Sequence, residues 1–233
     1  LNGGEGAPLT PLFHQLIVRQ KKIRIPCCVL NIGGISNITL IKQTTNPLQI
    51  FSRDIGPGNC LIDNWIRTNS ERKYDVDGQL AASGKINEII LEQAQDLYNN
   101  RKSKDKNSFD TNDFDISFSR GLTLEDGAAT LTDFTARIIG ESISSLLKNE
   151  KNIKDIIICG GGRRNKILLK FLYNYLHMKL NLKLIEEFGV NGDFVESQAF
   201  AFLAIRSHKK LPITFPNTTK CKKPSLGGEM IQN

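Results

Sequence analysis

Three glycine-rich segments, each beside a strand-like run, carry the residues of this chain that could do chemistry. The first runs from Asn31 through Gly33 and Gly34 to Asn37, between two apolar stretches. A Gly-Gly hairpin can take positive φ and bring bare backbone N–H groups close to an anion. Asn31, Gly33, Gly34 and Asn37 are therefore candidates for phosphate binding, although a plain hairpin turn has the same pattern.

The second segment places an acid at the end of a strand-like run. Asp54 directly precedes the loop Gly56-Pro-Gly58. A carboxylate in this position is a plausible general base or metal anchor. The alternative is an acid that caps the helix expected after Asn59.

The third segment, Gly160-Gly161-Gly162, follows an apolar run and precedes a helical pattern that begins at about residue 163. A helix N-terminus after such a turn attracts anionic groups or packs under a purine. The sequence has neither a GxGxxG fingerprint nor a Walker loop, so a dinucleotide fold and a P-loop are disfavoured. Together, the three segments suggest a protein that holds a nucleotide against a second substrate.

Composition and other motifs exclude several classes of function. The net charge is +7, but the basic residues are dispersed and not interleaved with aromatic ones, which favours a solvated surface over a nucleic-acid interface. Histidines are scattered and no GxSxG elbow occurs, which disfavours a histidine metal site and acyl hydrolysis. No apolar run is long enough to span a membrane. Five cysteines without CxxC spacing indicate a reducing, cytoplasmic setting.

The elements that must position these residues follow from periodicity and turn signals. Apolar and β-branched runs predict strands, and apolar residues at helical spacing predict helices. We expect strands over 23–33, 37–42, 49–54, 155–159 and around 182–187, helices from about 60 and over 85–98, 127–149 and 163–178, and a last helix capped near Asp193.

This element order is a β-meander followed by strand–helix crossovers, which predicts an α/β fold with a mixed sheet and helices on both faces. Such an order is the ribonuclease-H-like topology shared by sugar kinases, actin and heat-shock ATPases. Two polar stretches are less regular. The stretch 99–120 resembles a loop or lid, and Tyr74, Asp75 and Asp77 form either a solvated turn or a place for a carboxylate near a sugar or Mg²⁺.

Taken in order, these pieces resemble the anhydro-N-acetylmuramic acid kinases, a branch of the actin-like sugar kinases. The matching pieces are Gly4-Glu-Gly-Ala-Pro-Leu9, Asn31-Ile-Gly-Gly-Ile-Ser-Asn-Ile-Thr39, Asp54-Ile-Gly-Pro-Gly-Asn59, Tyr74-Asp-Val-Asp-Gly78, Ala129-Thr-Leu-Thr-Asp-Phe-Thr-Ala136, Cys159-Gly-Gly-Gly-Arg-Arg-Asn165, Gly192-Asp-Phe-Val-Glu-Ser-Gln-Ala-Phe-Ala201 and Leu226-Gly-Gly228.

The resemblance implies an ATP- and Mg²⁺-dependent carbohydrate kinase of peptidoglycan recycling. Such an enzyme opens 1,6-anhydro-N-acetylmuramic acid with water and yields N-acetylmuramic acid 6-phosphate. Asp54 would activate the water, the Asn31–Asn37 hairpin would bind phosphate, and Glu196 would reach the sugar. Gly160, Gly161 and Gly162, with Asn165, would belong to the adenosine pocket. A homodimer is possible, and neither nucleic acid nor a membrane is an expected partner.

The resemblance also suggests a division of the chain. Residues 1–20 would be the remnant of a preceding N-terminal lobe and residues 21–233 the C-terminal nucleotide-binding lobe, and a separately encoded chain could supply the first lobe. The chain departs from the family at Glu5, where Gln is usual, and at Ile55, where Thr is usual. Its segment 102–107 keeps only a trace of the family's Lys-Ser-Thr-Gly-Arg loop. The alternative to a kinase lobe is a catalytically inactive remnant that folds and binds nucleotide weakly.

Overall fold

A five-stranded mixed sheet forms the centre of the protein in the computed structural model, which describes residues 3–100, 108–176, 179–229 and 231. The family-like segment 102–107 therefore lies outside the described residues. The strands are β1 (Cys27–Ile32), β2 (Ile35–Ile41), β3 (Ile50–Pro57), β4 (Asp155–Cys159) and β5 (Asn181–Leu184). Their order in the sheet is β3-β2-β1-β4-β5.

The meander β1-β2-β3 is antiparallel, whereas β4 pairs in parallel with both β1 and β5. Antiparallel neighbours need only short hairpins, and the parallel strands are joined through helical crossovers. This arrangement confirms the predicted ribonuclease-H-like mixed sheet.

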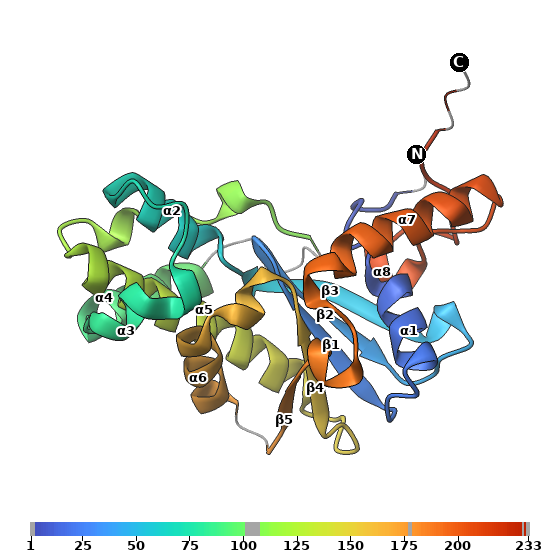
Figure 1. Ribbon diagram of the computed structural model, residues 1–233, viewed down its shortest axis with the longest axis horizontal. Helices are drawn as coiled ribbons and strands as arrows, with labels where there is room; N and C mark the ends of the chain where they lie inside the picture. The colour runs from blue at the N-terminus through green and yellow to red at the C-terminus, as the bar shows by residue number, and fades with distance from the viewer. Residues whose placement is uncertain (1–2, 101–107, 177–178, 230, 232–233) are drawn as a thin grey trace.

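Helices cover both faces of the sheet because successive residues of the buried strands point to opposite sides. On one face, Cys28 and Leu30 of β1 pack with α5 (Leu124–Leu147) and α6 (Lys166–Tyr175). On the other, Cys27 and Val29 pack with α1 (Pro11–Gln20) and α7 (Val195–His208). Figure 1 shows α5 and α6 on one side of the strands and α1 and α7 on the other.

A second group of helices extends from the sheet beside α5, at the left of Figure 1. It contains α2 (Cys60–Asn69), α3 (Gln79–Ser83) and α4 (Glu88–Asn99). These helices have their own apolar cluster, in which the buried Trp65 packs with Leu131 and Phe134 of α5. The helices α2, α3 and α4 therefore lie at one end of the sheet, close to the glycine-rich segments.

The predicted elements are all present, but some boundaries differ. The strand expected from residue 23 begins at Cys27, because Pro26 has no N–H to donate to a ladder. The strand expected to reach 187 ends at Leu184, where a 3-10 helix starts. Helices α1, α3 and α8 (Pro216–Thr219) were not predicted. Short 3-10 helices lie at Pro47–Gln49, Val76–Gly78, Thr111–Asp113, Ser117–Ser119, Gly161–Arg164, Ile185–Phe188 and Gly192–Phe194.

Candidate active site

Polar residues of three neighbouring strands form one row across the sheet. Asn31 of β1 pairs with Asn37 of β2, and Asn37 pairs with Asp54 of β3. Cross-strand partners point to the same face, here the face that α1 and α7 cover. A register shift between Ser36 and Asn37 sets this alignment. The hairpin and the acid, separate in the sequence patterns, are thus neighbours in the sheet.

Asp54 is a buried carboxylate with 4% of its surface exposed. The backbone N–H of Phe109 donates to its Oδ2 at 2.8 Å. Burial raises the pKa of Asp54 to about 6, against the opposing effect of hydrogen bonds from Phe109 and Ser108, and the nearby Glu5 carboxylate raises it further. A carboxylate with this pKa is ionised at pH 7 yet basic enough to accept a proton, as a general base requires.

A cavity of about 280 Å³ lies over Asp54. Asn37 and Asn31 line it from the sheet, Glu196 from the first turn of α7, and Thr10 and His14 from the N-terminal segment. Asn37 Oδ1 and Thr10 Oγ1 are buried and make no hydrogen bond within the described residues. Buried polar atoms are rarely left unpaired in folded proteins, so these two fit a ligand that offers hydroxyl or amide groups.

His14 was not predicted to belong to the site. Its Nδ1 lies 2.8 Å from Thr39 Oγ1, which lies 3.2 Å from Ser52 Oγ. Ser52 Oγ in turn donates to the carbonyl of Ile38. Burial lowers the pKa of His14 to about 4, so the ring is neutral at physiological pH and acts as a fixed polar group in the cavity wall.

A second cavity, of about 390 Å³, continues from the first. Asn31, Asn37 and Glu196 line both, and the second adds Gly33 and Gly34 from the hairpin and Gly160 and Gly161 from the turn after β4. Of the residues expected to bind phosphate, Asn31 and Asn37 therefore also line the cavity over the candidate base, whereas Gly33 and Gly34 line only the second cavity.

The reason for the glycines differs from the expectation. Neither Gly33 nor Gly34 has positive φ, so that prediction is wrong. Their carbonyl groups accept the N–H groups of residues 58–60, and the close approach excludes a side chain at Gly58, whose Cβ would lie 2.2 Å from Gly33 O. Gly160 does have positive φ, +81°, and a Cβ there would lie 2.5 Å from Ile32 O. The turn after β4 thus requires glycine on two counts.

A third cavity, of about 290 Å³, begins at Gly161 and extends toward the α2–α4 group. Asn165 lines it, and Asn165 Oδ1 also caps α6 by accepting the N–H of Leu168. Tyr74, Asp75 and Asp77 lie on the opposite wall. Asp75 accepts the N–H groups of Leu80 and Ala81, so its carboxylate stabilises the start of α3 and is buried, not solvated.

The buried Arg163 stabilises the glycine turn that follows β4. Its guanidinium pairs with Glu186 at 2.7 Å and Asp193 at 2.8 Å and donates to the carbonyl of Gly160 at 3.0 Å. This contact was missed because its partners lie 23 and 30 residues further along the chain. Only the pair of arginines after the three glycines pointed to a charged environment there.

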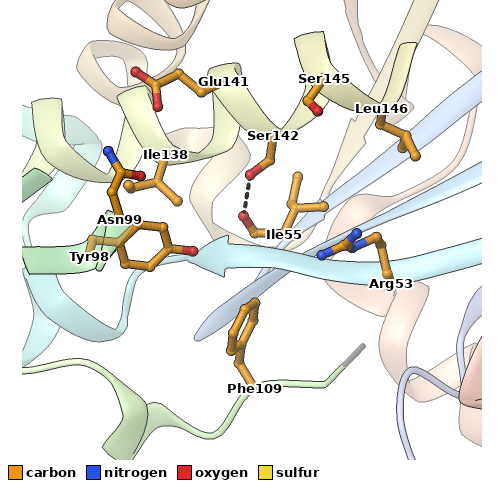
Figure 2. A pocket seen from close by; sticks show the side chains of 10 residues that line it. All are labelled: Arg53, Ile55, Tyr98, Asn99, Phe109, Ile138, Glu141, Ser142, Ser145 and Leu146. Carbon is orange, nitrogen blue, oxygen red and sulfur yellow. Dashed lines mark hydrogen bonds between the residues drawn. The ribbon is translucent and has the colours of Figure 1, made fainter. Parts of the chain in front are cut away.

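On the far side of β3, a separate cavity of about 340 Å³ lies between Arg53, Tyr98 and α5. Figure 2 shows the Arg53 guanidinium and the Tyr98 ring on opposite sides of the space, with the Phe109 ring below both. Phe109 also lines the Asp54 cavity. The ring therefore belongs to the walls of two cavities, one on each side of the edge strand.

Two negative findings concern the described residues only. They contain no group of three or more His, Cys, Asp or Glu side chains arranged to hold a metal ion. None of their helices combines the length and apolar character that a membrane span requires.

Comparison with known proteins gives one consistent family. The family model described as anhydro-N-acetylmuramic acid kinase matches residues 1–233. An anhydro-N-acetylmuramic acid kinase of Pelagibacter ubique (strain HTCC1062) is 52% identical over 233 residues, which are 100% of this chain and 62% of the relative. That of Zymomonas mobilis subsp. mobilis is 38% identical over 230 residues, 98% of this chain and 60% of the relative.

The chain thus spans about three fifths of the length of the curated relatives it matches. Among solved structures, the activator of the 2-hydroxyisocaproyl-CoA dehydratase from Clostridium difficile with bound ADPNP aligns with 85% of this chain and 68% of its own, at 14% identity and a TM-score of 0.43.

Proposed function

Because the chain belongs to the anhydro-N-acetylmuramic acid kinase family, we propose that it provides the nucleotide-binding lobe of a kinase that converts 1,6-anhydro-N-acetylmuramic acid to N-acetylmuramic acid 6-phosphate with ATP. The reaction would serve peptidoglycan recycling. In this proposal residues 21–233 form the lobe, and a preceding N-terminal lobe, on the same or a separate chain, forms the other wall of the cleft.

The observation that carries the proposal is the continuity of the three cavities. Gly161 lines both the third and the second, and Asn31, Asn37 and Glu196 line both the second and the first. A nucleotide with its adenosine against Gly160–Gly162 and Asn165 would direct its phosphates along the Gly33-Gly34 hairpin. Its γ-phosphoryl group would then meet a sugar held over Asp54. Positioning of this kind supplies most of the catalysis in phosphoryl transfer.

The chemistry follows from that placement. Asp54 accepts a proton from a water molecule as the water oxygen bonds to the anomeric carbon. The bond from that carbon to O6 breaks, and O6 takes the γ-phosphoryl group as ADP leaves. Glu196, Thr10 and the unpaired Asn37 Oδ1 would hold sugar hydroxyl and amide groups. The neutral His14 would add one further hydrogen bond without a charge.

Mg²⁺ would enter with the nucleotide. A nucleotide-bound Mg²⁺ is held mainly by phosphate oxygens and water, with one or two carboxylates from the protein. Glu196 lines the second cavity, where the phosphates would lie, so a site of this kind, with one carboxylate from the protein, fits the residues present. The ion would neutralise charge that develops on the transferred phosphoryl group.

The test is ATP-dependent phosphorylation of 1,6-anhydro-N-acetylmuramic acid, followed by phosphorus NMR of the product, with and without a supplied N-terminal lobe. We expect product only with the lobe, because phosphoryl transfer needs both walls of the cleft to exclude water. Asp54→Asn in the assembled enzyme should lower turnover about 100-fold or more while ATP binding stays intact. Near-normal turnover of that variant would discard Asp54 as the base.

The same assay separates the alternative. A catalytically inactive remnant would bind ATP in calorimetry yet form no product with any supplied lobe. Turnover by the 233-residue chain alone would instead show that a second lobe is dispensable. A homodimer remains a prediction, for which sedimentation of the purified chain is the direct measurement.

A further inference from the structure

Two consecutive backbone N–H groups beside the candidate base are each held by a different carboxylate. Phe109 N donates to Asp54 Oδ2 at 2.8 Å, and Ser108 N donates to Glu5 Oε2 at 2.9 Å. The two carboxylates come from β3 and from the N-terminal segment, 49 residues apart in the chain. Together they fix segment 108–109 in place over the Asp54 cavity.

Glu5 is itself anchored from a third part of the chain. Its Oε1 pairs with Lys220 Nζ at 3.1 Å, and its backbone N–H donates to Thr219 O at 2.8 Å. The segments around residues 5, 108 and 220 thus meet at one point, and a carboxylate joins all three. A neutral side chain of the same shape could accept the Ser108 N–H, but it could not make the ion pair.

We propose that Glu5 is a positioning residue for Asp54, which fixes segment 108–109 against the candidate base and places a second, lysine-balanced negative charge beside it. The use of this arrangement in catalysis rests on the proposed function, but the arrangement itself does not. Segment 108–109 matters because Phe109 lines both the Asp54 cavity and the far cavity of Figure 2. If the hydrogen bond from Ser108 to Glu5 were lost, the wall that these two cavities share would move.

The charges around Asp54 predict the direction in which each substitution should shift its pKa. Glu5 raises the pKa of Asp54 and Arg53 lowers it, while burial has the largest effect. Glu196 and the neutral His14 also face the cavity. Lys220 offsets the charge of Glu5. Removing the Glu5 charge should therefore lower the pKa of Asp54, whereas removing the Lys220 charge should raise it.

The experiment is a carbon-detected NMR titration of the Asp54 carboxyl group in the unsubstituted chain and in three variants. Glu5→Gln should lower the pKa of Asp54 by about 0.5–1 unit, the size expected for like charges that are partly screened. Lys220→Gln should shift it upward. Glu150→Gln is the matched control, since Glu150 pairs with Lys42 at the other end of β2, and it should leave the titration unchanged.

Opposite shifts in the first two variants support the proposal. Shifts in the same direction would mean that both variants merely loosen the segment, and that result overturns it, as does a titration that neither variant moves. The pH–rate profile of the assembled enzyme then tests the proposed function separately. If the titration shifts as expected but the acidic limb of the profile does not follow, Asp54 is not the catalytic base, and the role of Glu5 beside it still stands.

Discussion

Replacing Asp54 with Asn should stabilise the fold above pH 6 and leave its stability unchanged below about pH 4. Asn keeps the size of the side chain, and its carbonyl oxygen can still accept the N–H of Phe109. What the substitution removes is a carboxylate that must be ionised inside the protein at neutral pH. The variant therefore measures how much the buried charge lowers the free energy of unfolding.

The magnitude follows from the pKa. Burial raises it from 3.8 to about 6, a difference of about 2 units, which at 1.36 kcal/mol per unit sets a ceiling of about 3 kcal/mol. Because a cavity over the carboxylate admits water, we expect about 1–2 kcal/mol. The folded state holds its proton up to about pH 6 and the unfolded state only below 3.8. The wild-type protein should thus lose stability relative to the variant as pH rises through this window.

The assay is urea unfolding at pH 4, 5, 6 and 8, followed by the fluorescence of Trp65, the single tryptophan, which is buried in the cluster between α2 and α5. In thermal unfolding at pH 8, the Asp54→Asn variant should melt about 2–8 °C above the wild-type protein, the shift expected for a chain of this size. A stability difference that is the same at every pH would refute the reasoning, because the substitution would then act through packing.

A control with the opposite sign is available at Asp155. Although burial opposes it, hydrogen bonds from Asn181 and Lys183 lower the pKa of this carboxyl group. Asp155→Asn should therefore destabilise the fold at neutral pH, by an amount that shrinks as pH falls through the carboxylate range. Two Asp→Asn changes with opposite pH dependence exclude a general effect of net charge.

Three further predictions concern the glycine turn. In Gly161→Val the new Cβ would meet only Asn59 Nδ2, at 3.7 Å. The fold should survive while ATP affinity in calorimetry falls about tenfold or more, and equal affinity would remove Gly161 from the site. In Gly160→Ala the new Cβ would lie 2.5 Å from Ile32 O, at a residue whose φ is +81°. The substitution should therefore lower the free energy of unfolding in urea by about 2–4 kcal/mol. An unchanged urea midpoint would contradict this geometry. Arg163→Met removes the buried partner of Glu186 and Asp193, although Asp193 keeps its ion pair with Arg164, and should cost about 2 kcal/mol. A smaller loss when Glu186→Gln is already present would identify the ion pair as the source.

Local patterns predicted the sheet because β1 to β4 are rich in apolar and β-branched residues and each has glycine or proline at one end at least, whereas β5 has neither. The strand over 155–159 was predicted to the residue, whereas the strand expected over 49–54 continues to Pro57, so Asp54 lies within β3 and not at its end. Periodicity also predicted α5, though not that it starts at Leu124, where Thr123 caps it. Signals of this kind depend on neighbours in the sequence, and they were sufficient for the fold.

The contacts that complete the site are not local. The N–H that Asp54 accepts lies 55 residues away, and the one that Glu5 accepts lies 103 residues away. His14 sits on a helix whose Pro11 is a recognisable start signal, yet its partner Thr39 depends on how α1 packs on β2. The row from Asn31 to Asp54 depends on a register shift that no pattern in β2 or β3 announces. Pairing over such distances is decided by packing, which spacing along one segment does not encode.

Three features that cost the fold stability line one cavity, although unpaired buried oxygens also occur elsewhere among the described residues, at Gln95, Ser119, Thr132 and Thr135. A buried carboxylate with a raised pKa, an unpaired Asn37 oxygen and an unpaired Thr10 hydroxyl all line the same cavity. Each disfavours the folded state when the cavity is empty, by about 1–3 kcal/mol for a typical buried polar group. A ligand with hydroxyl and amide groups would satisfy the two unpaired atoms, and a water molecule could take the carboxylate's hydrogen bond. Proteins accept such local penalties where binding or catalysis requires them. The combination of a raised-pKa carboxylate with two unpaired polar atoms in one cavity therefore supports this cavity as the reaction site without reference to any relative.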